Sequence, residues 1–237
     1  TGIRIGERVV EAAQVLCTAD FPWAMKHLVR DRKAKGKYSD KKIDGMDYSC
    51  SCIMLYLGLD KKVSDLEVHN IQFAADFDRN INDNFQGRLP EDPSMYFYCP
   101  SKLDPSLAPA GGDALYVLVP VPNLKGNREL FTAPSLAAYR TRLMAKLRTC
   151  HGLEDIEGHI KFERMVTPLD FETEFNAYNG ATFGLAPTLL QSNYFRPHNQ
   201  SSTCRNLYFA GSSVHPGAGV PIVLTSAKLA VKDMLDS

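Results

Sequence analysis

The sequence lacks any excess of charge and any paired cysteine motif. It carries 27 basic and 27 acidic side chains among 237 residues, so its formal net charge is zero. This balance argues against a nucleic-acid-binding protein that works through a general positive field. The six cysteines form no CxxC pair and no repeated spacing. They provide no recognisable zinc-ligand set, so we expect no metal site, and they are typical of reduced thiols in a cytosolic protein.

The common nucleotide-binding motifs are also missing. No GxGxxG follows a strand near the start, and no glycine loop ends in Gly-Lys-Ser or Gly-Lys-Thr. No secretory signal is recognisable. The two long uncharged segments, 175–195 and 206–227, are both interrupted by Gly, Pro, Asn and Ser. Neither is therefore expected to span a membrane.

The most informative segment that is present covers residues 206–221, with the sequence NLYFAGSSVHPGAGVP. Its apolar stretch at 207–210 predicts a strand, and a Gly- and Ser-rich turn separates that strand from a helical pattern at 220–235. Such an arrangement brings unpaired backbone N–H groups and a helix dipole up to an anionic or electron-rich cofactor. The segment therefore predicts a cofactor contact, with an ordinary glycine-rich turn as the alternative.

The first part of the chain predicts short strands and one helix. The strands are expected at 3–5, 8–10 and 14–18, with a turn at Gly6 and Glu7. A helix is predicted over 20–32, with Asp20 as its cap. Its buried face would carry Phe21, Met25, Leu28 and Val29. The charged segment 33–42 predicts a linker or an exposed loop.

The middle of the chain predicts a sheet and a long helix. Runs rich in Tyr, Ile, Val and Phe predict strands at 50–57, 69–74, 95–99 and 115–120. Residues 134–150 form an amphipathic helical pattern. A further strand is predicted at 160–166, and residues 168–199 read as irregular. The expected fold is α/β with α+β character, in which an antiparallel or mixed sheet with a helix is inserted between α/β ends.

Taken in order, these segments resemble the carotenoid desaturase family, the flavin-dependent phytoene and diapophytoene desaturases. A single motif would be a weak match, whereas five in order over nearly the whole chain are a strong one. The matching motifs are SCS at 49–51 with LYLGL at 55–59; DPSMY at 92–96 with DPSLAP at 104–109 and YVLVPVP at 116–122; TPLDF at 167–171; QSNYFRPHN at 191–199; and Gly211 with HPGAG at 215–219.

The resemblance implies an incomplete FAD-binding, Rossmann-like domain with an inserted substrate domain. Residues 1–32 would be the returning segment of the FAD-binding domain, 33–199 the substrate-binding domain and 200–237 the C-terminal FAD-binding segment. Family members carry an N-terminal GxGxxG unit that holds the ADP part of FAD. This chain has none, so we expect it to be the C-terminal part of a longer enzyme and to be inactive without the missing N-terminal half.

Two positions depart from the family pattern. The family usually has Ala-Gly-Thr where this chain has SSV at 212–214, and Gly-Val where it has Ile222 and Val223. A β-branched residue at 222 is expected to crowd the backbone where the cofactor or the helix approaches.

The resemblance also implies which residues form the site. The backbone around the flavin end of FAD would come from Gly211, Ser212, Ser213, His215, Gly217, Gly219, Val220 and Pro221. His215 would either bring its imidazole near the flavin ring or form a rigid turn with Pro216. Asp20 would approach the cofactor, although a helix cap is an equally good structural role.

Candidate catalytic and substrate residues lie in the loop that leads to the cofactor strand. Arg196 and His198 would stabilise developing charge or accept the leaving proton; structural hydrogen bonding is the alternative. An apolar tunnel for the substrate would be lined by Tyr178, Phe183, Tyr194 and Phe195, for which a plain core role is the alternative.

The implied reaction is FAD-dependent dehydrogenation of an acyclic carotenoid precursor, a hydrophobic polyene without a polar handle. A carotenoid isomerase or oxidase on the same scaffold, and a non-catalytic module that binds lipid or polyene, are the alternatives. Uptake of such a substrate from a bilayer would suit a cytoplasmic protein that associates peripherally with a membrane.

Overall fold

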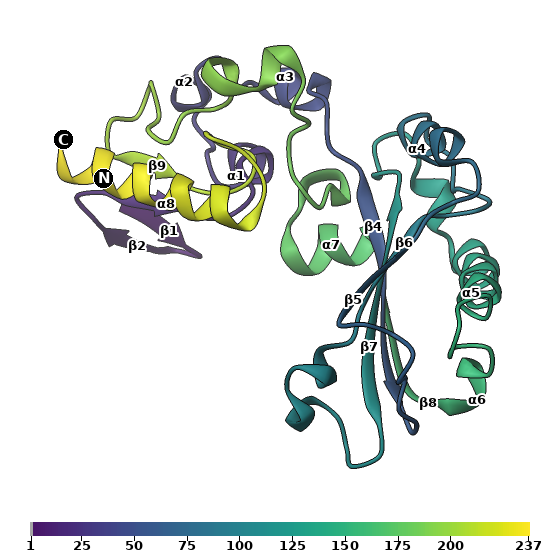
Figure 1. The fold of residues 1–237 in the computed structure, drawn as a ribbon. Helices are drawn as coiled ribbons and strands as arrows, with labels where there is room; N and C mark the ends of the chain where they lie inside the picture. The colour runs from purple at the N-terminus through teal and green to yellow at the C-terminus, as the bar shows by residue number, and fades with distance from the viewer. Residues whose placement is uncertain (1) are drawn as a thin grey trace. The chain divides into compact units, whose positions relative to one another are not determined.

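The computed structural model describes residues 2–237, and the chain divides into two compact units (Figure 1). Unit 1 combines the residues up to Ser49 with Glu172–Ser237, and unit 2 is Cys50–Phe171. These boundaries differ from those expected at 32/33 and 199/200. The physical reason is that residues on both sides of the expected boundaries share one apolar core, to which the chain contributes Phe21, Ile43, Tyr48, Leu185 and Phe209.

Unit 1 contains two small sheets. Strands β1 (Gly2–Ile5) and β2 (Arg8–Glu11) form an antiparallel hairpin. Strands β3 (Val15–Cys17) and β9 (Leu207–Phe209) lie far apart in the sequence and pair in parallel. The predicted strands near the start and at 207–210 are therefore confirmed. The carboxyl ends of the parallel pair lead into Asp20 on one side and Gly211 on the other.

The helices of unit 1 differ from the prediction at several points. The helix expected over 20–32 is wrong in length, because α1 (Phe21–His27) ends early and Asp31 caps a separate helix, α2 (Arg32–Lys35), by accepting a hydrogen bond from the Lys33 amide. Leu28 is exposed, contrary to expectation. The predicted linker over 33–42 is also wrong, since α2 and α3 (Asp40–Gly45) occupy most of it.

Two further helices, α7 and α8, lie in the last third of the chain. The C-terminal helix, α8 (Val220–Leu235), agrees with the pattern at 220–235. Helix α7 (Pro168–Phe175) lies in the stretch that was expected to be irregular. Only the remainder of that stretch, up to 199, consists of turns and short 3₁₀ segments.

Unit 2 is built on a five-stranded antiparallel sheet. Its strands are β4 (Ser51–Leu59), β5 (His69–Gln72), β6 (Met95–Tyr98), β7 (Asp113–Val121) and β8 (Ile160–Val166), in the order β5-β6-β7-β4-β8. All pairings are antiparallel, which confirms the inserted antiparallel sheet. The α/β fold class with an inserted sheet-and-helix part is likewise confirmed.

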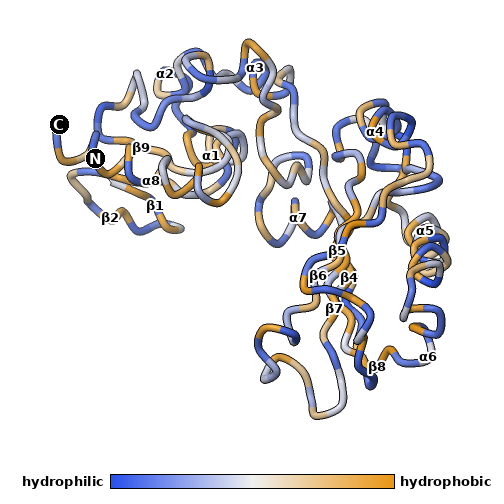
Figure 2. Tube along the Cα trace, in the orientation of Figure 1, coloured by the Kyte–Doolittle hydropathy of each residue, from blue (hydrophilic) through white to orange (hydrophobic). Residues whose placement is uncertain are grey.

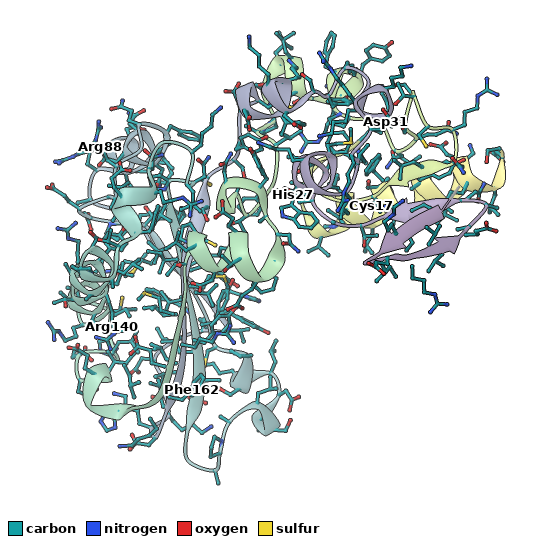
Figure 3. The ribbon with its side chains drawn as sticks, turned by 180° about the vertical axis from the view of Figure 1, so that it is seen from behind. Cys17, His27, Asp31, Arg88, Arg140 and Phe162 are labelled. Atoms are coloured by element: carbon teal, nitrogen blue, oxygen red, sulfur yellow. The ribbon has the colours of Figure 1, made fainter. Side chains whose placement is uncertain are left out.

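Helix α5 (Ala133–Leu147) covers one face of this sheet (Figure 1). Successive strand residues point to opposite faces of a sheet, and hydrophobic residues recur along β4 and β7 (Figure 2). The core beneath α5 includes Leu55 and Val117 from the strands, and Leu143 and Leu147 from the helix. At the rim, Arg140 of α5 (Figure 3) donates two hydrogen bonds of 2.5 Å to the carboxylate of Glu163 on β8.

Helix α4 (Phe77–Phe85) was not predicted, and its pattern is inverted. It exposes Phe77, Ile81 and Phe85, whereas Asn80 and Asp83 are buried. Asp76 caps it by accepting a hydrogen bond from the Arg79 amide. The polar buried face explains why an apolar-periodicity argument missed this helix.

A prediction concerns Tyr139, whose buried hydroxyl has no hydrogen-bond partner among the described residues. Such a group carries its desolvation cost uncompensated, so Tyr139→Phe should raise the free energy of unfolding by about 1 kcal/mol. Leu143→Ala, on the same buried face, should lower it by about 2–5 kcal/mol. Chemical denaturation of the three proteins measures both effects. A loss of stability in Tyr139→Phe would contradict the unpaired hydroxyl.

Candidate functional site

A cavity of about 180 Å³ lies in unit 1, where the parallel strands β3 and β9 end. Ligands of open α/β sheets bind outside the carboxyl ends of parallel strands, which makes this cavity the leading candidate site. Both chain segments that leave the strands contribute to its wall. The lining residues are Thr18, Ala19, Asp20, Phe21, Phe175, Ala177, Ala181, Thr182, Phe209, Ala210, Gly211, Ser212, Ser213 and Val214.

The glycines of this region have backbone conformations that disfavour a side chain. Gly211, Gly217 and Gly219 have φ angles of 148°, 151° and 104°. An added Cβ would find no atom within 4 Å at Gly211 and none closer than 3.8 Å at the other two. The backbone at Gly211 therefore borders open space, whereas the Cβ positions at Gly217 and Gly219 lie at van der Waals distance from neighbouring side chains. That geometry fits the close approach of a flat group such as a flavin ring.

Asp20 is a half-buried carboxylate in the wall of the cavity. It is the N-cap residue of α1, as expected, but its side chain makes no capping hydrogen bond to the helix. Instead its Oδ1 accepts a hydrogen bond from the Ser213 hydroxyl at 2.5 Å, and its Oδ2 accepts one from the Tyr178 amide at 2.9 Å. Burial raises the pKa of Asp20, although these hydrogen bonds and the charge of Arg196 act in the opposite direction. Residues 211–219 are called the glycine segment. Asp20, at the start of α1, thus connects this segment to the turn at Tyr178.

Arg196 is only 2% exposed, and its guanidinium binds the backbone from within. It donates to four carbonyl oxygens, those of Gln191 at 3.0 Å, Leu185 at 3.1 Å, Val214 at 3.2 Å and Ser212 at 2.5 Å. Burial lowers the pKa of Arg196. Two of the four acceptors belong to the glycine segment, so this arginine fixes the shape of that segment. These contacts favour the structural hydrogen-bonding role that was the alternative for Arg196 in the sequence analysis.

The two histidines lie next to each other on the same loop system. The rings of His198 and His215 are stacked, with 6.4 Å between their centroids. The buried Nδ1 of His215 has no hydrogen-bond partner among residues 2–237. The His215 amide donates to the carbonyl of Pro197 at 2.8 Å, which joins the two loops. A buried nitrogen without a hydrogen-bond partner calls for an explanation, and a polar group of a bound ligand would supply the partner that Nδ1 of His215 lacks.

The start of α8 completes the segment. Gly219 is the N-cap residue and Pro221 lies in the first turn, so the helix begins directly after the last glycine. Val220 is exposed. A Cβ added to Gly217 would lie 4.0 Å from the Ile222 side chain, and one added to Gly219 would lie 3.8 Å from it. These are ordinary van der Waals distances, and the crowding of a cofactor by Ile222 stays a prediction.

The predicted site residues are only partly brought together. Asp20, Gly211, Ser212 and Ser213 line the cavity, whereas the other predicted cofactor residues lie further along the same segment. None of the four aromatic residues predicted for a substrate tunnel lines this cavity. Those residues are Tyr178, held by Lys26 and Asp44 through its hydroxyl, and the exposed Phe183, Tyr194 and Phe195.

Sequence reasoning missed the part of the wall contributed by 175–182. Phe175, Ala177, Ala181 and Thr182 reach the cavity from the end of α7 and the turns after it. No periodicity marks them, since the turns are irregular and two of their asparagines, Asn176 and Asn179, have positive φ. By contrast, Thr18 and Ala19 could have been found, because they directly precede Asp20.

Comparison with known proteins identifies the class of this site. The chain matches the family of flavin-containing amine oxidoreductases over residues 2–235, and it belongs to that family. The family implies FAD as the cofactor, in agreement with the prediction. In a search of solved structures, an oxidoreductase from Methanosarcina mazei matches 98% of this chain with a TM-score of 0.51 at 16% identity, which supports the fold alone.

Within the family, the resemblance to carotenoid desaturases is confirmed. A 4,4'-diapophytoene desaturase (4,4'-diaponeurosporene-forming) of Staphylococcus haemolyticus is 46% identical over 99% of this chain. The corresponding protein of Staphylococcus aureus strain MRSA252 is 45% identical over 98% of it. In both cases the match covers 47% of the relative. The chain thus spans about half the length of the curated relatives it matches.

A prediction follows from the raised pKa of Asp20. Because the folded state holds this proton more tightly than the unfolded chain does, stability should fall as the pH rises from about 4 through the raised pKa. Asp20→Asn removes the titrating group and should remove this loss. Denaturant unfolding at several pH values between 4 and 8 measures the difference.

The matched control for that experiment is Asp236→Asn, at the exposed end of α8. It should follow the wild-type pH dependence. An identical pH dependence in wild type and Asp20→Asn would show that Asp20 has the same pKa in the folded and unfolded states.

Proposed function

We propose that this chain is the C-terminal part of an FAD-dependent desaturase that dehydrogenates an acyclic carotenoid precursor. The observation that carries the proposal is the 46% identity to a 4,4'-diapophytoene desaturase over 99% of the chain. The substrate class is a linear, hydrophobic polyene of the kind named for that relative. Carotenoid biosynthesis is the corresponding process.

The cavity and glycine segment of unit 1 would hold the flavin end of FAD. When bound, FAD supplies the hydride-accepting chemistry of the reaction. Gly211, Gly217 and Gly219 would let the backbone approach the ring system. The first turn of α8, a helix of 16 residues, would direct its free amides toward a polar part of the cofactor. Asp20 and Ser213 would keep this wall in one arrangement.

We assign different tasks to the loop residues. Arg196 would hold the glycine segment in shape through its four backbone contacts rather than touch the reacting atoms. His198 and His215 would present imidazole nitrogens near the cofactor, with the unpaired Nδ1 of His215 available to a polar group of the ligand. Tyr178, Phe183, Tyr194 and Phe195 remain candidates for apolar substrate contacts.

The two compact units suggest a division of labour. Unit 1 would contact the cofactor and unit 2 the substrate, with the unit boundaries replacing 32/33 and 199/200. In a desaturase of the relatives' length, an N-terminal dinucleotide-binding half would pack on unit 1. Supporting features are the two-stranded parallel sheet, which is small for an independent one, and the exposed Val220, Leu224, Val231 and Leu235 of α8 (Figure 2).

We also propose peripheral contact with a bilayer, because the proposed substrate partitions into lipid. Within residues 2–237, no helix is long and apolar enough to cross a membrane.

The cofactor assignment predicts the effect of Gly217→Val in a protein of the relatives' length. Valine would strain a residue at φ 151° and would place its side chain against Arg196 and Ile222, beside the backbone proposed to contact the flavin. We expect this variant to purify without flavin, as measured by visible absorption before and after heat release.

Gly126→Val is the matched control, since Gly126 also has positive φ, at 74°, and open space around its Cβ position, but lies in unit 2. It should retain normal flavin content. Normal flavin content in Gly217→Val would overturn the proposed cofactor site.

A further inference from the structure

The face of the unit 2 sheet opposite α5 carries a straight row of aromatic side chains. Cross-strand pairs join His69 to Tyr98, Tyr98 to Tyr116, and Tyr116 to Tyr56. Directly paired residues point to the same face of a sheet, so these four rings form one line across β5, β6, β7 and β4. We call it the aromatic row. With strands about 4.8 Å apart, the row is about 14 Å long.

The rings of the row contact one another. Ring centroids are 4.9 Å apart for His69 and Tyr98, 6.3 Å for Tyr98 and Tyr116, and 5.5 Å for Tyr56 and Tyr116. These distances are those of favourable aromatic pairs. The row therefore forms a continuous aromatic surface, with rings that support each other.

A second, parallel line of side chains lies beside the aromatic row. It follows the same strands two residues away and is apolar except for one tyrosine hydroxyl. The pairings that define it join Ile71, Tyr96, Leu118, Met54 and Val166. Tyr96 links the two lines, since its hydroxyl is 2.7 Å from Nδ1 of His69 and its ring is 6.1 Å from that of Tyr116.

The surroundings of the aromatic row are weakly polar. Burial raises the pKa of Tyr116, at the centre, to about 12. The three tyrosines of the row carry no formal charge, and the first charged residue in line is Arg164, paired with Tyr56 at the far end. Tyr56 remains 39% exposed and Phe162 on β8 (Figure 3) is also exposed. The aromatic row thus offers partly exposed aromatic surface, with a charged side chain in line only at its Arg164 end.

This chemistry fits a linear hydrocarbon better than a peptide or an ionic ligand. A peptide added to a sheet bonds to backbone groups at an edge strand, whereas β6, β7 and β4 are interior strands. An anion would find only one cation, at the end of the row. A polyene needs no hydrogen bond, and its flat chain gains dispersion contacts with each successive ring.

We propose that the aromatic row is the binding surface of unit 2 for the polyene substrate, which lies across the strands along His69, Tyr98, Tyr116 and Tyr56. The inference rests on the proposed function for the class of substrate. It adds the surface and the direction of the chain. The tyrosines act through their ring faces, so their hydroxyls are dispensable for binding.

The test uses the 237-residue chain and the conjugated polyene 4,4'-diaponeurosporene, the product named for the relatives. Binding is followed by the circular dichroism that a chiral surface induces in the visible band of the polyene. Tyr98→Ala with Tyr116→Ala should weaken binding by at least about tenfold, while Tyr98→Phe with Tyr116→Phe should stay within about twofold of wild type. Far-ultraviolet circular dichroism checks that the variants fold.

Tyr56→Lys provides a second variant at the more exposed end of the row, in case the alanine pair disturbs the sheet. It puts a charge on the row and should also weaken binding at least about tenfold. Phe77→Ala with Phe85→Ala is the matched control, because it removes two exposed aromatic rings of α4 in the same unit. That control should bind like wild type.

Three results would overturn the inference. They are wild-type affinity in folded alanine and lysine variants of the row, an equal loss in the α4 control, and no binding of the polyene to the wild-type chain. Flavin content of a protein of the relatives' length tests the proposed function separately. Normal flavin content, together with polyene affinity that is unchanged in the variants of the aromatic row, would reject this inference and leave the proposed function standing.

Discussion

The candidate site depends on the hydrogen bonds that the buried guanidinium of Arg196 donates to the backbone. It gathers four backbone carbonyls from three loop segments, including those of Ser212 and Val214. Each hydrogen bond from a charged donor contributes about 1.5–3 kcal/mol, and the buried carbonyls would be unsatisfied without it. A glycine-rich segment has little intrinsic rigidity. The arginine supplies the order that the glycines lack.

Asp20 acts from the other side of the same segment. Its carboxylate accepts hydrogen bonds from the Ser213 hydroxyl and the Tyr178 amide, so three distant parts of the chain meet at one half-buried group. With Arg196 behind the segment and Asp20 at the cavity wall, the backbone of 211–214 has one defined course between them. The open space beside Gly211 is a consequence of that course. A preorganised wall of this kind lowers the entropy cost of holding a cofactor.

Much of this fold could be predicted from the sequence because the long strands and helices carry local residue patterns typical of their type. The apolar, aromatic-rich run of β7 predicted a strand of the sheet, and the amphipathic pattern of α5 predicted the helix that covers it. Local rules failed where tertiary contacts decide. Asp20 resembles a helix cap but bonds to Ser213, and α4 buries Asn80 and Asp83 instead of its phenylalanines.

In the candidate site, too, the parts with local sequence signatures were predicted and the parts set by tertiary contacts were not. The glycine segment and Asp20 were predicted from motifs, since glycine and a strand-to-helix turn have local signatures. The wall from 175–182 and the aromatic row were not, because they depend on irregular turns and on strand register. The pairing of Tyr98 with Tyr116 and of Tyr116 with Tyr56 cannot be read from a single strand. Register, rather than composition, brings these rings into one line.

Hydrogen–deuterium exchange tests the central claim, that the glycine segment and the Asp20 wall contact the flavin, most directly. The experiment compares a protein of the relatives' length with and without FAD. The account predicts slower exchange at the amides of 18–21 and 211–219 when FAD is bound, with little change at 113–121 in the unit 2 sheet. Unchanged exchange at 211–219, with protection confined to other segments, would contradict it.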